Sequence, residues 1–422
     1  MLSAEQNELL TRVEGNAPMG QLMRRHWLPA CLSDEVTDRD GTPVRTRLLG
    51  EDLVIFRNTN GELGALQERC PHRKASLAFG RNEDCGLRCL YHGWKFAVDG
   101  TVLDMASEPN SERKMKSFKH QSYPTAESGG FVWVYMGPEE TKTKFQPPAW
   151  APTPDVKTSI VKIQTPCNWA QVLEGSIDSA HSSSLHSTNM PAAEVEGSTA
   201  TADAWLRPSR DKSPRLEIEM TDYGFNYAAL RKPITNEQND VYIRTTVFIA
   251  PFTVLIPPNN QYKLAQMLFP IDDYNTMFYW IAWHPDPEKG IEQEEWRRFC
   301  SAEVGIDLDE NYQKKLSLGN WYNQDRRAMK DGDFTGIKGI PMQDMAMWES
   351  MGAIADRGHE ILGSSDLSIV KFRTQMLKAV EDFVSGSPAI GTQDTSTPHI
   401  QLSSFEGVVP KSTDWRILED IN

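Results

Sequence analysis

Two short cysteine–histidine motifs constrain this 422-residue chain more than any other feature of its sequence. Cys70 and His72 are separated by one residue, and Cys89 and His92 by two. A cluster of two irons and two sulfides can be held in this way, with both thiolates on one iron and both imidazoles on the other. Each pair lies in a short stretch containing proline or glycine, which favours tight turns that point two side chains at one metal.

A zinc site with two cysteines and two histidines is the main alternative for these residues. Zinc fingers usually begin with a more widely spaced pair of cysteines, and the Cys70–His72 half does not have that form. The complete motifs, CPHR at 70–73 and CLYHGW at 89–94, closely resemble those of Rieske proteins. This resemblance implies a Rieske [2Fe-2S] cluster.

The composition is that of a globular protein, with 39% hydrophobic and 24% charged residues. A formal net charge of −14 argues against nucleic-acid binding and against docking on anionic membranes. No apolar run approaches the ~18 residues of a membrane helix, and the opening segment lacks the apolar core of a signal peptide. We therefore expect a cytoplasmic protein.

Hydrophobic patterning predicts an α+β protein of two domains. Short alternating runs, interrupted by the turns Asn60-Gly61 and Asp99-Gly100, predict a small all-β domain with the cluster ligands at loop tips. The proline-rich segment 146–155 marks a boundary. We expect residues 1–150, including an N-terminal helical segment, to form the Rieske domain, and residues 151–422 to form the catalytic domain. The last forty residues are expected to lie over the surface or to cover a neighbouring subunit.

A second metal site is indicated by Asp178, His181 and His186, in a segment that we expect to be helical from Asn168 to His186. Two histidines and one carboxylate on one face of iron(II) leave positions open for dioxygen and substrate. On an ideal helix, residues five apart diverge by about 140°. We therefore predict a π-type bulge or a helix end at Ser182–Ser184. The alternative is a polar helix with surface histidines.

The pattern NWxxxxEGxxDxxHxxxxH, which begins at Asn168, resembles the catalytic site of Rieske non-haem iron oxygenases. The resemblance covers essentially the whole chain and implies a helix-grip-like catalytic domain, an antiparallel sheet covered by helices. It also implies that His181 and His186 bind a mononuclear iron, and that Asp178 joins an iron ligand to a cluster histidine, here His92, across a subunit boundary. A carboxylate three residues before a ligating histidine can reach that ring and fix its tautomer.

The third iron ligand must come from another part of the chain. The family places its aspartate in a Gln-Asp or Glu-Asp step at the start of a late helix, and Gln343-Asp344 is such a step. The resemblance therefore assigns the role to Asp344, with Asp356 and Asp366 as rivals. Asp344 could instead be only a helix-start residue that the helix dipole stabilises.

The opening residues and the helix motif resemble the phthalate dioxygenase group, whose members act on aromatic carboxylates. Burying a dianionic substrate requires paired cations, and the arginine fork matches a carboxylate. Arg207 and Arg244 are the candidates, Ser179 could donate a hydrogen bond, and Arg231 is held in reserve. The alternatives are that Arg207 is a surface charge on a loop and that Arg244 lies on the solvated face of its strand.

The resemblance implies cis-dihydroxylation of an aromatic carboxylate by dioxygen, with electrons from NADH through a separate reductase. Phthalate attacked at its 4,5 positions is the expected substrate, because anchored carboxylates would point the far ring edge at the iron. Isophthalate, chlorobenzoate or phenoxybenzoate, a monooxygenation or demethylation, and a plain Rieske electron carrier remain open. The family forms trimers and stacked hexamers, so a homotrimer or homohexamer is expected.

Overall fold

The computed structural model describes residues 1–393 and 398–418 and has an α+β fold. The chain divides into two compact units, a small one from Val13 to Gln146 and a large one that combines Met1–Arg12 with Pro147–Asn422. No helix within the described residues has the length and apolarity of a transmembrane span.

The small unit consists of short antiparallel strands in three sheets. The predicted turns at Asn60-Gly61 and Asp99-Gly100 join neighbouring strands, and Gly61 and Gly100 both have the positive φ that such turns require. The strands are β1 (Trp27–Leu32), β10 (Phe131–Tyr135) and β9 (Thr125–Ser128); β2 (Val44–Leu48), β3 (Glu51–Arg57) and β4 (Leu63–Gln67); and β5 (Arg81–Glu83), β6 (Gly86–Arg88), β7 (Trp94–Phe96) and β8 (Val102–Met105). Two short helices, α2 (Pro18–Met23) and α3 (Glu112–Met115), belong to the same unit.

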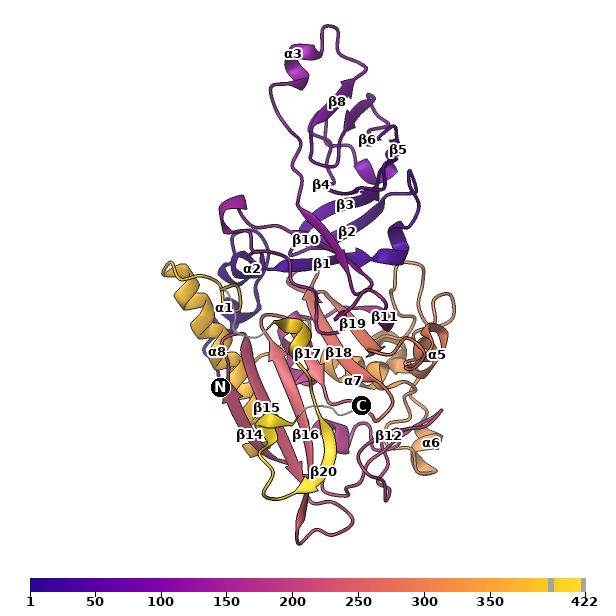
Figure 1. Ribbon diagram of the computed structural model, residues 1–422, viewed down its shortest axis with the longest axis vertical. Helices are drawn as coiled ribbons and strands as arrows, with labels where there is room; N and C mark the ends of the chain where they lie inside the picture. Colours follow the sequence, from indigo (N-terminus) through magenta and orange to yellow (C-terminus); the bar gives the residue numbers. More distant parts are fainter. Residues whose placement is uncertain (394–397, 419–422) are drawn as a thin grey trace. The chain divides into compact units, whose positions relative to one another are not determined.

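The large unit is built on an eight-stranded antiparallel sheet (Figure 1). Long runs rich in β-branched and aromatic residues form its central strands, where nearly every side chain is buried. The strand order is β11 (Lys157–Thr165), β19 (Thr276–His284), β18 (Lys263–Pro270), β17 (Thr253–Ile256), β16 (Asp240–Ile249), β15 (Gly224–Arg231) and β14 (Arg215–Met220), and β20 (Glu406–Pro410) also pairs with β16. A separate two-stranded sheet is formed by β12 (Thr199–Ala200) and β13 (Trp205–Leu206).

The last strand corrects one expectation. Residues near the C-terminus were expected to lie over the surface, but β20 joins the main sheet beside β16 (Figure 1). In that register Glu406 stands directly opposite Arg244. The β-branched pair Val408-Val409 favours a strand. The strand with which it pairs, β16, lies far away in the sequence.

Helices cover the sheet and fix the segment that carries the histidines. They are α4 (Trp169–Ser176), α5 (Gln293–Phe299), α6 (Arg326–Lys330), α7 (Ile340–Ser350) and α8 (Leu367–Val384). At the end of α4 the buried carboxylate of Glu174 accepts two hydrogen bonds from Arg357, at 2.8 and 3.1 Å, and one from Arg373 at 2.7 Å. Breaking such a buried pair typically costs about 3–5 kcal/mol, so α4 is tied firmly to the later helices.

The first helix, α1 (Ala4–Thr11), begins with the capping box of Ser3 and Gln6. It packs on α8 and α4, and the side chain of Asn168 donates a hydrogen bond to the carbonyl of Thr11 at 3.0 Å. These contacts group residues 1–12 with the large unit, whereas the sequence analysis assigned the N-terminal helix to the Rieske domain.

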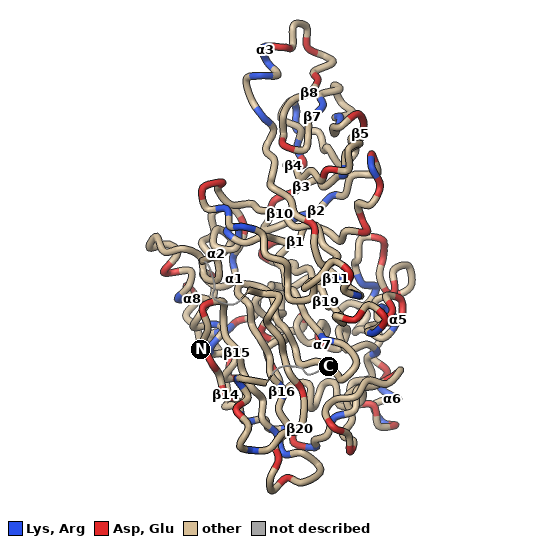
Figure 2. The backbone as a smooth tube through the Cα atoms, in the orientation of Figure 1, with Lys and Arg blue, Asp and Glu red and all other residues tan. Residues whose placement is uncertain are grey.

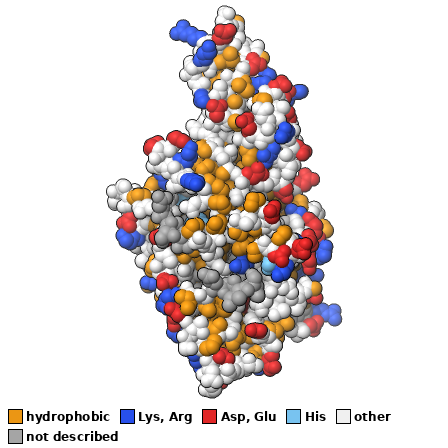
Figure 3. All heavy atoms as spheres, in the orientation of Figure 1, with side chains coloured by type: hydrophobic (Ala, Val, Ile, Leu, Met, Phe, Trp, Pro, Cys, Tyr) orange, Lys and Arg blue, Asp and Glu red, His pale blue; other side chains and the backbone are white. Residues whose placement is uncertain are grey.

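Charge is distributed unevenly over the large unit. In α5 the acidic residues lie in the first turn and the basic residues in the last turn, and charged residues of both signs also occur in the neighbouring loops (Figure 2). The space-filling view shows the same region as a patch with many acidic atoms (Figure 3). Because the chain as a whole carries a net charge of −14, an anionic ligand would need a local group of cations at its binding site.

Candidate metal centres and substrate cavity

The first cluster loop is closed by its own backbone. The N–H of Cys70 donates to the carbonyl of Ala75 at 2.9 Å, and the N–H of Lys74 donates to the carbonyl of Cys70 at 2.8 Å. Lys74 has a φ of +62°, in the left-handed region that side-chain-bearing residues seldom adopt.

The second loop repeats the same pattern. The N–H of Cys89 donates to the carbonyl of Trp94 at 2.8 Å, and the N–H of Gly93 donates to the carbonyl of Cys89 at 3.0 Å. Gly93 occupies the position equivalent to Lys74 and has a φ of +73°. The two ligand pairs therefore lie in two loops with the same backbone hydrogen bonds and a positive φ at the same position.

The four side chains converge as a metal site requires. The ring of His72 stacks on Trp94, with centroids 4.5 Å apart, and its centroid lies 4.3 Å from that of His92. The buried Nδ1 of His72 has no hydrogen-bond partner among the described residues. Burial raises the pKa of Cys70 to about 11, and the nearby Cys89 contributes to the rise. Thiols of this kind become ligands only when a metal displaces their protons. The donors therefore fit a [2Fe-2S] cluster.

The segment that carries the second pair of histidines leaves the helix early. The helix expected as far as His186 ends at Ser176, and a separate 3₁₀ turn spans His181–Ser183. The prediction of a local distortion is confirmed, but its predicted position is wrong, because the chain departs six residues before Ser182. The break allows His181 and His186 to face one point.

Asp344 on α7 completes a group of three metal-ligating side chains. Its Oδ1 lies 3.0 Å from Nε2 of His186 and 3.5 Å from Nε2 of His181, and the two Nε2 atoms are 3.2 Å apart. These ligand atoms all lie within 4.8 Å of one another. Two imidazoles and one carboxylate in this arrangement suit ferrous iron with open positions.

The rival aspartates lie elsewhere. Asp356 is exposed, and its carboxylate contacts His359 at 2.8 Å. Asp366 ends the 3₁₀ turn Ser364–Asp366, and its carboxylate accepts the N–H of Gly363, the residue before that turn, at 2.6 Å. Among the described residues, Asp344 is thus the aspartate that reaches both histidines.

Gln343 orients one of these rings, a role that the sequence analysis did not identify. Its side-chain oxygen lies 2.7 Å from Nδ1 of His186, and its nitrogen donates to the carbonyl of Ile337 at 2.8 Å. Because a backbone carbonyl only accepts, the amide oxygen must face the ring, and Nδ1 must carry the proton. The lone pair of Nε2 then points at Asp344 and a metal. The signal available in the sequence was its position directly before Asp344.

Asp178 supports the other histidine. Its Oδ1 accepts the N–H of Ala180 at 2.8 Å, and its Oδ2 lies 3.6 Å from Nδ1 of His181. Burial lowers the pKa of His181, but Asp178 and then Asp344 outweigh it, so that the pKa is raised. The site therefore stabilises positive charge at this ring, as a cation-binding site does.

A cavity opens beside the three ligands. One face of the large sheet forms much of its wall, because alternate residues of each strand share a face. Apart from the metal-ligating group, its lining includes Ser179, Met190, Trp205, Arg207, Tyr227, Arg244, Thr246, Ile256, Gln266 and Trp280. The predicted substrate residues Ser179, Arg207 and Arg244 therefore lie in one cavity with the histidines.

Arg244 is only 6% exposed, so the alternative of a solvated strand face is wrong. Its Nε lies 3.3 Å from Oε2 of Glu406, the residue opposite it on β20. The hydroxyl of Tyr242 also donates to Glu406. Burial lowers the pKa of Arg244, but Glu406 outweighs it and raises the value overall.

Arg207 is 5% exposed, so the alternative of a surface charge is wrong as well. Its Nη2 donates to the sulfur of Met190 at 3.0 Å, and its Nε has no partner among the described residues. Burial, followed by the charge of Arg244, lowers the pKa of Arg207 to about 9. Among the described residues, no carboxylate forms an ion pair with this buried guanidinium.

Arg231 acts behind the cavity wall. Its Nη2 donates to the carbonyl of Ser179 at 2.7 Å, and Nη1 and Nη2 donate to the hydroxyl oxygen of Ser179 at 3.3 and 3.2 Å. Arg231 is not among the residues that line the cavity. The residue held in reserve as a substrate ligand therefore positions Ser179.

A cluster-type Cys₂His₂ site and a two-histidine, one-carboxylate site on one chain are the combination found in Rieske non-haem iron oxygenases, and the chain belongs to this family of oxidoreductases. Residues 26–124 match the Rieske [2Fe-2S] domain, and residues 134–422 match the LigXa C-terminal domain-like family. The protein therefore carries a Rieske cluster and a mononuclear iron.

Individual relatives narrow the family further. The phthalate 4,5-dioxygenase oxygenase subunit of Pseudomonas putida is 56% identical, over 99% of this chain and 94% of its own. The 3-chlorobenzoate-3,4-dioxygenase oxygenase subunit of Comamonas testosteroni is 35% identical, over 98% of this chain and 97% of its own.

A solved structure supports the fold alone. The reduced complex between oxygenase and ferredoxin in carbazole 1,9a-dioxygenase has a TM-score of 0.56 at 21% identity, with 90% of this chain and 97% of that chain covered.

Proposed function

We propose that this protein is the oxygenase component of a dioxygenase that converts phthalate to its cis-4,5-dihydrodiol. The observation that carries the proposal is the charge around the substrate cavity. Asp178 and Asp344 contact the metal-site histidines. Apart from these two acids, the three buried guanidinium groups of Arg207, Arg231 and Arg244 are accompanied, among the described residues, by one buried carboxylate, that of Glu406. Two positive charges are left uncompensated, and a dicarboxylate dianion would balance them.

The residues of the cavity have distinct roles in this proposal. Arg207 and Arg244 hold the two carboxylates, and Ser179 assists them. Because the oxygen of Ser179 accepts from Arg231, its hydroxyl proton remains free to donate to the substrate. The apolar surfaces of Trp205, Trp280 and Ile256, which line the same cavity, pack on the ring. The far ring edge then faces the metal-ligating group, which selects the 4,5 positions.

The metal-ligating residues complete the proposal. His181, His186 and Asp344 hold the mononuclear iron, and Cys70, His72, Cys89 and His92 hold the cluster. When bound, the cluster supplies single electrons and the ferrous ion activates dioxygen. Asp178 joins His181 to His92 of the partner subunit, which requires a symmetric assembly, a homotrimer or a stacked homohexamer. A separate NADH-dependent reductase provides the electrons, and the protein acts in the cytoplasm.

The alternatives differ in substrate charge. Chlorobenzoate and phenoxybenzoate carry a single carboxylate and would leave one guanidinium unbalanced, although relatives named for both substrates share the fold family. Isophthalate carries two carboxylates and satisfies the same charge argument. The uncompensated charge therefore favours a dicarboxylate over a monocarboxylate.

The test is product identification with the purified holoenzyme, a matching reductase and NADH. Phthalate, isophthalate, benzoate and 3-chlorobenzoate are compared, and products are identified by mass spectrometry and NMR. We expect the cis-4,5-dihydrodiol of phthalate to form fastest. A preference for a monocarboxylate, or a demethylated or monohydroxylated product, would contradict the proposal.

Arg244→Gln sharpens this test. Removing a buried charged partner typically costs about 2–5 kcal/mol in binding, so kcat/KM for phthalate should fall by about 100-fold. The value for benzoate should fall much less. Arg215→Gln, on the exposed edge strand β14 of the same sheet, is the matched control. An equal loss of kcat/KM for phthalate and benzoate would show that Arg244 does not bind the second carboxylate.

A further inference from the structure

A second cavity adjoins the substrate cavity. The two cavities share Met190 and Arg207 in their walls. The second cavity is also lined by Arg210, Lys212 and Arg231, and Arg210 and Lys212 are exposed to solvent. In a protein with a net charge of −14, this is a pronounced local concentration of positive charge.

The one acid in the described walls, Asp211, can offset only one of the four cations Arg207, Arg210, Lys212 and Arg231. The Oδ1 of Asp211 accepts the N–H of Ser213 at 2.9 Å, and its Oδ2 accepts the N–H of Lys232 at 3.2 Å. The carboxylate thus shapes the loop. Within the described chain, Arg210 and Lys212 make no ion pair.

The inner end of the cavity contains two buried cations. Arg207 and Arg231 are 5% and 3% exposed, and the Nε of each has no partner among the described residues. A buried guanidinium without a carboxylate is costly unless an anion is supplied. Both ends of the second cavity, exposed and buried, therefore favour an anionic ligand.

The wall between the two cavities can open at low cost. It contains the contact from Nη2 of Arg207 to the sulfur of Met190. A thioether is a weak acceptor, and the methionine side chain is flexible. A carboxylate oxygen would bind Arg207 more strongly than this sulfur does, so an anion arriving from the second cavity can take the place of Met190.

We propose that the second cavity is an anion-binding antechamber, in which Arg210 and Lys212 capture the aromatic dicarboxylate from solution and Arg207 receives it at the boundary with the substrate cavity. The identity of the anion rests on the proposed function. Exposed cations around a cavity raise the association rate of a dianion, and salt weakens this effect.

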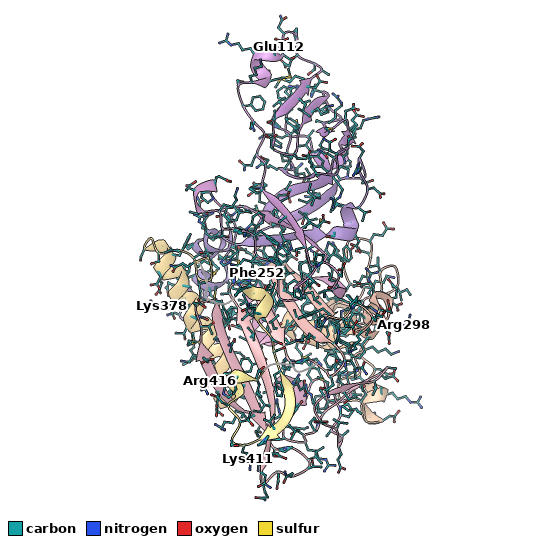
Figure 4. All side chains as sticks on the ribbon, viewed as in Figure 1. Glu112, Phe252, Arg298, Lys378, Lys411 and Arg416 are labelled. Atoms are coloured by element: carbon teal, nitrogen blue, oxygen red, sulfur yellow. The ribbon has the colours of Figure 1, made fainter. Side chains whose placement is uncertain are left out.

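The experiment compares the double variant Arg210→Gln/Lys212→Gln with a matched control, Lys371→Gln/Lys378→Gln. Both control lysines are exposed residues of α8, and Lys378 is labelled in Figure 4. Both variants remove two surface cations, and the control residues line neither cavity. At ~10 mM salt we expect kcat/KM for phthalate to fall about 10-fold in the first variant only. At ~0.5 M salt the difference should nearly vanish. The effect should fall on KM, with kcat at saturation within about twofold of the wild type.

Stopped-flow tryptophan fluorescence on the resting holoenzyme measures phthalate association without turnover. Association that is slower and less sensitive to salt in Arg210→Gln/Lys212→Gln than in the control supports the antechamber. If the wild type binds phthalate but does not oxidise it, only the proposed reaction is overturned. Association rates and salt dependence equal to those of the control overturn the antechamber. A wild-type protein that neither binds nor oxidises phthalate overturns both proposals.

Discussion

The two metal centres are assembled in opposite ways. The cluster ligands come from two nearby loops, each closed by backbone hydrogen bonds between Cys70 and Ala75 or between Cys89 and Trp94. The mononuclear site joins His181 and His186, which follow α4, to Asp344 on α7, far along the chain. A local site depends on turn geometry, whereas a long-range site depends on the packing that aligns its helices.

The substitution with the largest expected effect disrupts the long-range site and leaves the cluster intact. His181→Ala removes one of three converging ligands, so the mononuclear iron should be lost and turnover abolished. The cluster loops have their own hydrogen bonds, so the visible absorption of the cluster should be unchanged. Iron analysis, absorption spectra and product formation measure the three outcomes. Retained turnover would show that this centre is not the oxidation site, and a bleached cluster would show that the two centres are not independent.

Gln343 tests how far the long-range site depends on a neighbouring side chain. Gln343→Leu removes the acceptor for Nδ1 of His186, and loss of such a group typically costs about 10–100-fold in metal affinity or activity. Gln343→Glu keeps an acceptor and should lose much less. Iron affinity in competition with a chelator distinguishes this from general destabilisation. Equal iron affinities in the two variants would show that Gln343 does not orient the ring of His186.

The same contrast explains what the sequence could predict. Spacing within one loop is a property of a few neighbouring residues, so the cluster motif could be interpreted directly. The motif that begins at Asn168 identified two of the three converging ligands, His181 and His186, and the resemblance supplied Asp344. The chain, however, leaves the helix at Ser176, earlier than predicted. Helix ends depend on tertiary contacts such as those of Glu174 with Arg357.

The arginine end of the cavity shows the limit more clearly. Periodicity alone could not decide whether Arg244 faced the solvent or the interior. Its partner, Glu406, lies on a strand whose register exists only after β20 pairs with β16. Only the folded sheet shows that Arg231 turns to Ser179 and leaves the cavity to Arg207 and Arg244.

Glu406→Gln tests this charge balance. It leaves three buried guanidinium groups without a carboxylate, which should lower the free energy of unfolding by about 3 kcal/mol. Phthalate should restore part of the loss and stabilise this variant more than the wild type. Urea unfolding with and without phthalate measures both effects. Asp414→Asn, in an exposed pair with Arg416 on the same C-terminal segment, should lower the free energy of unfolding far less. If the two variants behave alike, Glu406 does not compensate the arginines.

The smallest effects should appear in the cluster loops, and they should have opposite signs at equivalent positions. Gly93→Ala places a Cβ at a φ of +73° and 2.9 Å from the Cβ of Ala106, which should destabilise the loop by about 1–2 kcal/mol. Lys74→Gly relieves the same backbone strain at a φ of +62°. Because glycine adds freedom to the unfolded chain, the net gain should be at most about 1 kcal/mol. The temperature at which the visible circular dichroism of the cluster disappears measures both changes. If both substitutions lower that temperature, the side chain of Lys74 stabilises its loop by more than its backbone strain costs, and the two loops are not equivalent.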